Sequence, residues 1–162
     1  MKKIFVLLVA IATMFAQNVL AQEKPQLSDE QKAAAKAKRE QLMQTRLELL
    51  KTELNLTDEA MAKFDPVYRE YRKEIGRVTS MNKDARMKKD QITNENALKV
   101  VSARLANQIL TATVKQRYLM IFAEVIEPLQ VEVLYKVDEK VSREANKIVK
   151  YRQTATEMDA KK

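Results

Sequence analysis

The scarcity of glycine and proline is what most limits the folds open to this chain. Its 162 residues include one glycine and three prolines, which leaves almost no turn chemistry for hairpins or sheets. Apolar residues recur instead at steps of three and four, the period of an amphipathic helix. The sequence therefore predicts an all-α fold of four helices in one domain.

Each expected helix has its own apolar stripe. The first helix is expected to begin at Ser28, where residues 28–31 (Ser-Asp-Glu-Gln) have the form of a capping box, and the second at Asp58. Thr93 is the expected cap of the third, at about residues 94–125, and the fourth follows Pro128. The stripes are Met43, Leu47, Leu50 and Leu54; Met61, Phe64, Tyr68, Tyr71, Ile75 and Val78; Leu98, Val101, Leu105, Ile109, Tyr118, Phe122 and Ile126; and Leu134, Val137, Val141, Ala145 and Ile148.

The third helix is long for a chain of this size. It would extend ~45 Å at about 1.5 Å per residue, whereas a compact domain has a radius of gyration of ~14 Å. Part of its stripe must then stay uncovered or pack against a second copy. We therefore predict an elongated protomer with a long helical hairpin, and a homodimer. A break near Thr111-Ala112-Thr113 would instead give two shorter helices.

Two prolines lie near expected helix starts. Pro128 suits a first helical position, where its missing N–H needs no partner. Pro66 either bends the second helix two turns from its start or follows a fresh cap at Asp65. Either arrangement bends the chain there, and such a bend would curve the helical layer.

The first 21 residues have the pattern of a cleaved export signal. Lys2 and Lys3 precede an apolar run over residues 4–15, and Val19-Leu20-Ala21 offers small residues before a cut ahead of Gln22. The run is shorter than the ~20 residues that span a bilayer, although a retained N-terminal anchor is the alternative. We expect a mature chain of residues 22–162 in the periplasm, with residues 22–27 and 154–162 frayed.

The charge balance narrows the choice of partners. Without the signal, 28 Lys and Arg stand against 22 Asp and Glu, a net charge of +6. Export argues against nucleic acid as the partner of this basic surface. Anionic membrane, lipopolysaccharide and acidic or unfolded polypeptide remain. A mixed-charge solvated surface is the alternative.

The composition argues against catalysis. Histidine and cysteine are absent, which removes the commonest general base and the strongest nucleophile, and the lone Gly76 excludes a glycine-rich phosphate loop. Carboxylates alternate with Lys and Arg as surface pairs, as in Glu70 and Lys73, and form no dense cluster for a metal. We expect no enzyme activity, no cofactor and no metal.

Two short segments carry a family resemblance. Leu56-Thr57-Asp58-Glu59-Ala60 joins two helical stretches, and Ile126-Glu127-Pro128-Leu129-Gln130 lies in the same context seventy residues on. Together they resemble worn copies of the LTxxQ motif of the Spy/CpxP family. In that family the Leu packs inward, the Thr caps the next helix and the Gln ties the turn.

Each copy departs from the motif differently. Thr57 is a sound cap with two acids in the first turn, but Ala60 replaces the Gln. The second copy keeps Pro128 and Gln130, where many members have Pro and Gln, and has Ile126 for Leu and Glu127 for Thr. Residues 61–71 and 116–122 also resemble small exported homologues of Bacteroidetes-type bacteria, and the resemblance covers most of residues 40–145.

The resemblance implies a cradle-shaped homodimer with a basic, partly apolar concave face. Such a protein would act as an ATP-independent chaperone for unfolded or partly folded envelope proteins, or as a regulator of a membrane stress sensor or sigma-factor pathway. Weak contact with anionic membrane is a third possibility. Charge would speed encounter with a client, and methionines would make adaptable contacts. The candidate client-binding residues are Arg69, Arg72, Lys73, Arg77, Met81, Arg86, Met87, Lys88 and Lys89, and their alternative role is a solvated helix face.

Overall fold

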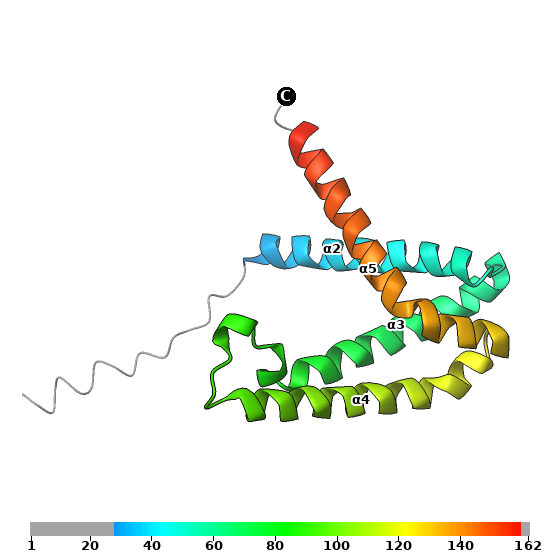
Figure 1. Cartoon of the computed structure of the whole chain (residues 1–162). Helices are drawn as coiled ribbons and strands as arrows, with labels where there is room; N and C mark the ends of the chain where they lie inside the picture. The colour runs from blue at the N-terminus through cyan, green and yellow to red at the C-terminus, as the bar shows by residue number, and fades with distance from the viewer. Residues whose placement is uncertain (1–27, 160–162) are drawn as a thin grey trace, which may run out of the picture. The chain divides into compact units, whose positions relative to one another are not determined.

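The computed structural model describes residues 28–159, so the predicted signal segment lies outside the described residues. Within that range the chain contains no strand, which confirms the all-α prediction for this part (Figure 1). Four α-helices and two short 3-10 helices follow one another as α2 (Asp29–Glu53), α3 (Asp58–Met81), η1 (Asp84–Arg86), η2 (Lys89–Gln91), α4 (Ala97–Ala123) and α5 (Pro128–Asp159).

The chain divides into two compact units, residues 1–37 and 38–162. In the described part of the first unit, the predicted capping box begins α2. The Ser28 hydroxyl accepts a hydrogen bond from the Gln31 N–H at 3.2 Å, and the Gln31 side chain accepts one from the Ser28 N–H at 3.0 Å. The sequence predicted this cap correctly because the capping residue and its partners lie within one helical turn.

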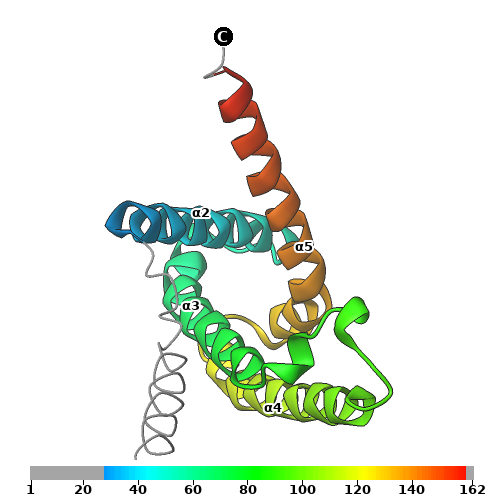
Figure 2. The same cartoon turned by 90° about the vertical axis from the view of Figure 1, so that its left-hand side faces the viewer.

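An aromatic cluster forms the centre of the second unit, where α3 and α4 lie side by side (Figures 1 and 2). The fully buried Phe122 ring lies 5.7 Å from Phe64, 5.4 Å from Tyr71 and 6.2 Å from Tyr135, centroid to centroid. Such pairs add about 0.5–1.5 kcal/mol each beyond area burial. The aliphatic part of this core includes Leu47, Leu50, Leu54, Leu56, Val78, Val114, Ile126, Val131, Leu134 and Val141.

Both possible helix breaks are absent. α3 continues through Pro66, so a fresh helix capped by Asp65 is wrong. An interior proline costs about 3 kcal/mol of helix stability, and burial of Phe64 and Tyr68 on the same helix offsets that cost. α4 likewise runs unbroken through residues 111–113, which leaves one long helix as first predicted.

The start of the third helix differs from the prediction. Thr93 does not cap α4, because the helix begins at Ala97 with Asn96 as its N-cap residue. Asn96 instead uses its side-chain oxygen to accept a hydrogen bond from the Thr93 N–H at 2.8 Å, closing a turn ahead of the helix. At the other end of the chain the last helix, α5, extends to Asp159.

The stripe predicted for the third helix is wrong in its first half. Leu98, Val101, Leu105 and Ile109 are between 50% and 84% exposed. The buried positions are Val100, Ala103, Val114 and Phe122. At about 100° per residue these two sets point to opposite sides of the helix. We call the exposed row the outer seam of α4, and it consists of Leu98, Val101, Leu105, Ile109, Ala112 and Leu119.

Candidate binding surface

The segment between α3 and α4, residues 82–96, is the centre of the predicted basic region, and we call it the basic loop. Two cations of α4 hold it in place. The Arg104 guanidinium donates to the carbonyls of Ala85 at 3.3 Å and Met87 at 3.0 Å. Lys99 forms an ion pair with Asp84 at 3.0 Å. These contacts anchor residues 84–87 of the loop to α4, although the loop contains only two single-turn 3-10 helices.

Most of the candidate residues around this loop face solvent. Arg86, Lys88 and Lys89 are exposed, and Met87 is half-buried with its sulfur 3.9 Å from the Asn96 amide nitrogen. Within residues 28–159 no ion pair neutralises Lys88 or Lys89. The loop thus presents solvated positive charge of the kind that attracts an anionic or acidic partner.

The last turn of α3 adds an apolar contact next to this charge. Met81 is 63% exposed, and its sulfur lies 3.9 Å from the guanidinium of Arg77. Arg77 itself pairs with Glu74 at 3.5 Å while remaining largely exposed. A cation and a flexible thioether therefore stand together at the start of the loop.

The three basic residues nearest the middle of α3, Arg69, Arg72 and Lys73, have different surroundings. Lys73 is exposed and pairs loosely with Glu70 at 3.5 Å. Arg69 is paired with Asp65 on its own helix and with Glu40 on α2. Both side chains are thus engaged at the surface, each with different partners.

Arg72 requires a correction, because its side chain is only 19% exposed and forms an ion pair with the buried Asp138. Asp138 also accepts hydrogen bonds from the hydroxyls of Tyr68 at 2.7 Å and Tyr71 at 3.3 Å. Burial raises the pKa of both tyrosines, and the Asp138 carboxylate raises it further. Arg72 therefore belongs to the core and we leave it out of the candidate surface.

A second arginine faces the same buried carboxylate. Burial lowers the pKa of Arg46, and the neighbouring Arg72 lowers it further, whereas Tyr68 and Asp138 raise it. The Nε atoms of Arg46 and Arg72 find no hydrogen-bond partner among the described residues. Sequence reasoning missed this network. Its one signal was the position of Asp138 on the buried face of α5, four residues after Leu134 and three before Val141.

The first motif segment is a helix reversal closed by its own backbone. Asn55 has a positive φ of 50°, the left-handed conformation that commonly ends a helix. The Asn55 N–H donates to the Thr52 carbonyl at 3.2 Å and the Leu56 N–H to the Lys51 carbonyl at 2.9 Å. This pair of bonds is the Schellman pattern, and it directs the Leu56 side chain into the core.

The start of α3 follows at once. The cap predicted at Thr57 is present, since its hydroxyl accepts a hydrogen bond from the Ala60 N–H at 3.2 Å. Asp58 and Glu59 occupy the first turn, where negative charge suits the positive end of the helix. Lys51 of α2 donates a hydrogen bond to Asp58, and this lowers the pKa of that carboxyl.

The second motif segment is closed by a side chain. Ile126 is buried, and Pro128 is the first residue of α5. The Gln130 side chain accepts a hydrogen bond from the Glu127 N–H at 3.0 Å and donates one to the Leu54 carbonyl at 3.1 Å. Gln130 thus ties the second turn to the first across the fold.

The two motif segments, far apart in sequence, therefore meet in space. Between them lies a polar groove of about 600 Å³. Ala60 lines it on the first segment, at the place where Gln130 stands on the second. The other lining residues are Asn55, Thr57, Ala123, Glu124, Val125, Ile126, Glu127 and Pro128.

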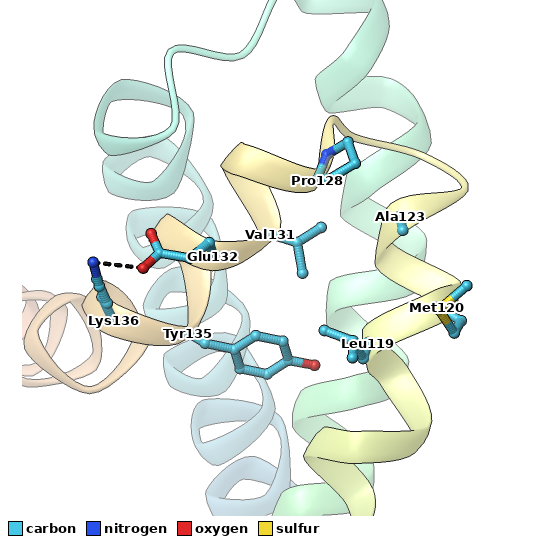
Figure 3. Close-up of a pocket in the computed structure, with 8 residues that line it drawn as sticks. All are labelled: Leu119, Met120, Ala123, Pro128, Val131, Glu132, Tyr135 and Lys136. Carbon is cyan, nitrogen blue, oxygen red and sulfur yellow. Dashed lines mark ion pairs between the residues drawn. The ribbon is translucent and has the colours of Figure 1, made fainter.

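An apolar groove of about 590 Å³ opens where α4 ends and α5 begins (Figure 3). Leu119 and Met120 form the α4 side, and Tyr135 extends from α5 toward Leu119. The Tyr135 hydroxyl donates to the Lys115 carbonyl at 2.7 Å, and burial raises its pKa to about 12. The remaining lining residues are Ala123, Pro128, Val131, Glu132 and Lys136, the last two as an ion pair at the rim.

These surfaces offer cations, thioethers and apolar side chains, which are groups for noncovalent contact. In the described part of the chain, no three carboxylates gather in a way that could hold a metal ion. Within residues 28–159 we also find no helix with the length and hydrophobicity of a membrane span.

No protein-family model matches this chain, and no curated protein or solved structure is significantly similar to it. The resemblance to the Spy/CpxP family therefore rests on the motif segments and their sequence context.

Proposed function

We propose that the protein is an exported, ATP-independent chaperone-like protein that binds unfolded or partly folded envelope proteins. The observation that carries this proposal is the solvated charge of the basic loop, with Lys88 and Lys89 unneutralised within the described residues and the exposed Met81 immediately before the loop in the chain. Charge attracts a flexible client from a distance, and the thioether packs against many apolar shapes. The client-binding residues are Lys73, Arg77, Met81, Arg86, Met87, Lys88 and Lys89, with Arg69 at the edge.

The sequence supports the setting of this activity. The export pattern of residues 1–21 favours the periplasm, and the two motif segments favour the cradle-like helical layer and the homodimer of the Spy/CpxP family. The buried Leu56 and the cap at Thr57 are compatible with the roles that the family motif implies. Binding is proposed in place of catalysis because the loop contains no histidine, the commonest general base, and no cysteine, the strongest nucleophile.

An aggregation assay on the mature protein tests the proposal. We expect it to suppress the light scattering of a denatured client without ATP. Reversing the charges of Arg86, Lys88 and Lys89 to Glu is expected to reduce suppression several-fold. The matched control reverses the exposed Lys36, Lys63 and Lys150, which changes the net charge equally at other places on the surface.

The possible results separate the competing functions. No suppression by the wild-type protein at molar excess would overturn the chaperone proposal. An equal loss in both charge-reversed variants would show that net charge, and not the basic loop, drives binding. Capture of one membrane sensor without general suppression of aggregation would favour a regulator.

A further inference from the structure

Two exposed methionines have different surroundings. Met81 is 63% exposed and Met120 is 68% exposed. The Met81 sulfur lies 3.9 Å from a guanidinium nitrogen of Arg77, which stands one turn earlier on α3. In the described part of the chain no hydrogen-bond donor reaches the Met120 sulfur. The two side chains are therefore similarly open to a small reagent, and they differ in whether a cation stands beside the sulfur.

Among the described side chains, the other methionines are less open. Met87 is half-buried, and Met43 and Met61 are partly buried against the core. An oxidant such as hydrogen peroxide converts methionine into its sulfoxide, and it must reach the sulfur to do so. Within this set the reaction is therefore expected to begin at Met81 and Met120.

The separation between Met81 and Arg77 suits a sulfoxide better than a thioether. A thioether sulfur accepts hydrogen bonds only weakly, whereas oxidation adds a polar oxygen to it. The 3.9 Å between sulfur and nitrogen leaves room for one oxygen atom that is bonded to the sulfur and accepts a hydrogen bond from the guanidinium. Arg77 thus already stands where the sulfoxide oxygen of Met81 would form.

The reaction with hydrogen peroxide can use this donor. The sulfur lone pair attacks one peroxide oxygen and the O–O bond breaks. The departing hydroxide takes the proton from the oxygen now bound to sulfur and leaves as water, so the products are methionine sulfoxide and water. Negative charge develops on the departing oxygen and then remains on the sulfoxide oxygen. A cationic donor already held in place stabilises such charge.

We propose that Met81 is a site of reversible oxidation, at which Arg77 promotes formation of the sulfoxide and then holds its oxygen. Methionine sulfoxide reductases reverse the change. The consequence for clients rests on the proposed function. Oxidation replaces the adaptable apolar thioether at the start of the basic loop with a polar group, so peroxide weakens client binding while the charge of the loop stays the same.

Peroxide treatment of the mature protein, followed by peptide mass spectrometry, tests the site. We expect Met81 to be oxidised several-fold faster than Met120, although its exposed fraction is slightly smaller. Arg77→Ala should bring the rate at Met81 down to that at Met120. The substitution uncovers the sulfur, so a slower reaction cannot come from burial. Lys63→Ala removes another exposed cation from α3 and is the control that should leave the rate at Met81 unchanged.

The aggregation assay tests the consequence for clients. The wild-type protein treated with peroxide is expected to suppress client aggregation several-fold less than the untreated protein, and a methionine sulfoxide reductase should restore the suppression. Met81→Leu keeps an apolar side chain that peroxide cannot oxidise, so it should still suppress aggregation after treatment. Met120→Leu is the matched control and should lose suppression as the wild type does.

Two results would overturn the oxidation site. They are equal rates at Met81 and Met120 in the wild-type protein, and a rate at Met81 that Arg77→Ala leaves unchanged or raises. The link to client binding is wrong if peroxide impairs Met81→Leu as strongly as the wild type. A wild-type protein without any suppression before oxidation would overturn the proposed function instead, and the rates from mass spectrometry would still decide the oxidation site.

Discussion

The two motif segments begin a helix at a buried aliphatic residue by different chemistry. The first uses local groups, since the left-handed Asn55 closes α2 and the Thr57 hydroxyl caps α3. The second uses Pro128, which needs no N–H partner, and the long Gln130 side chain, which reaches Leu54 of the first segment. The first segment could form by itself, whereas the second becomes complete only when the two meet.

Each copy of a degenerate motif can thus lose a different interaction while the two copies together keep both. The hydroxyl cap survives only at Thr57 and the amide tie only at Gln130. Because the segments are adjacent in the fold, each supplies what the other lacks. Substitutions in the two turns test how much each interaction contributes to stability.

The largest expected effect comes from what the two turns share. Leu56→Ala and Ile126→Ala each remove a buried side chain and should lower the free energy of unfolding by about 2–5 kcal/mol. Urea unfolding followed by circular dichroism measures the loss. Leu129→Ala, at an exposed position of the second segment, is the control and should change stability little. A small effect at only one of the two buried sites would show that the turns are not equally anchored.

The next effect isolates the tie between the turns. Gln130→Ala leaves the Leu54 carbonyl and the Glu127 N–H without their partner and should cost about 1–3 kcal/mol. Gln130→Glu keeps an acceptor for Glu127 but cannot donate to Leu54, so it should fall between wild type and the alanine variant. Gln116→Ala, at an exposed site on α4, is the matched control. If Gln130→Glu were as stable as wild type, the bond to Leu54 would contribute nothing.

The local cap should matter somewhat less. Thr57→Ala removes the acceptor for the Ala60 N–H and should destabilise the protein by about 1 kcal/mol. Thr57→Ser keeps the hydroxyl and should restore most of that loss in the same urea titration. Equal losses in both variants would point to the Thr57 methyl group and not to the cap.

A gain is expected from restoring the missing amide. Gln130 reaches the carbonyl two residues before Leu56, so by the same geometry Ala60→Gln should reach that of Glu124, two residues before Ile126. Both Ala60 and Glu124 line the polar groove. One added hydrogen bond should raise stability by about 0.5–1 kcal/mol. Ala60→Glu offers no donor at neutral pH and is the control that should show no gain.

The smallest expected effect is a pH dependence confined to the first turn. The hydrogen bond from Lys51 holds the Asp58 pKa below its usual 3.8 in the folded protein. The pair therefore stabilises the fold above that pH, and the stabilisation disappears as the pH falls through the folded value. Lys51→Met should flatten this acid limb while changing little near neutral pH. Urea midpoints measured across the acid range would show an unchanged limb if the pair is irrelevant.

Much of the fold follows from signals that lie within one turn of the chain. The capping box at Ser28, the cap at Thr57 and the proline at Pro128 each satisfy backbone groups a few residues away, so the sequence alone determines where three helices begin. The buried face of α3 could also be predicted from the sequence. The spacing of Phe64 and Tyr71 matches one face of a helix, and no other face of α3 is comparably apolar.

Local signals of this kind leave open which face of a helix is buried and which charges pair. α4 is apolar on two opposite faces. The spacing of its apolar residues therefore could not predict that Val100 is buried and Leu98 exposed. The sequence predicted Arg72 as a surface cation. In the structure Arg72 is largely buried because it pairs with Asp138, which lies sixty-six residues later in the chain. Hydrogen bonds within a turn are local, so the amino-acid sequence predicts which segments are helices and where most of them start. The choice of buried face and of charge partner came only with tertiary packing, because those energies depend on residues that are distant in the chain.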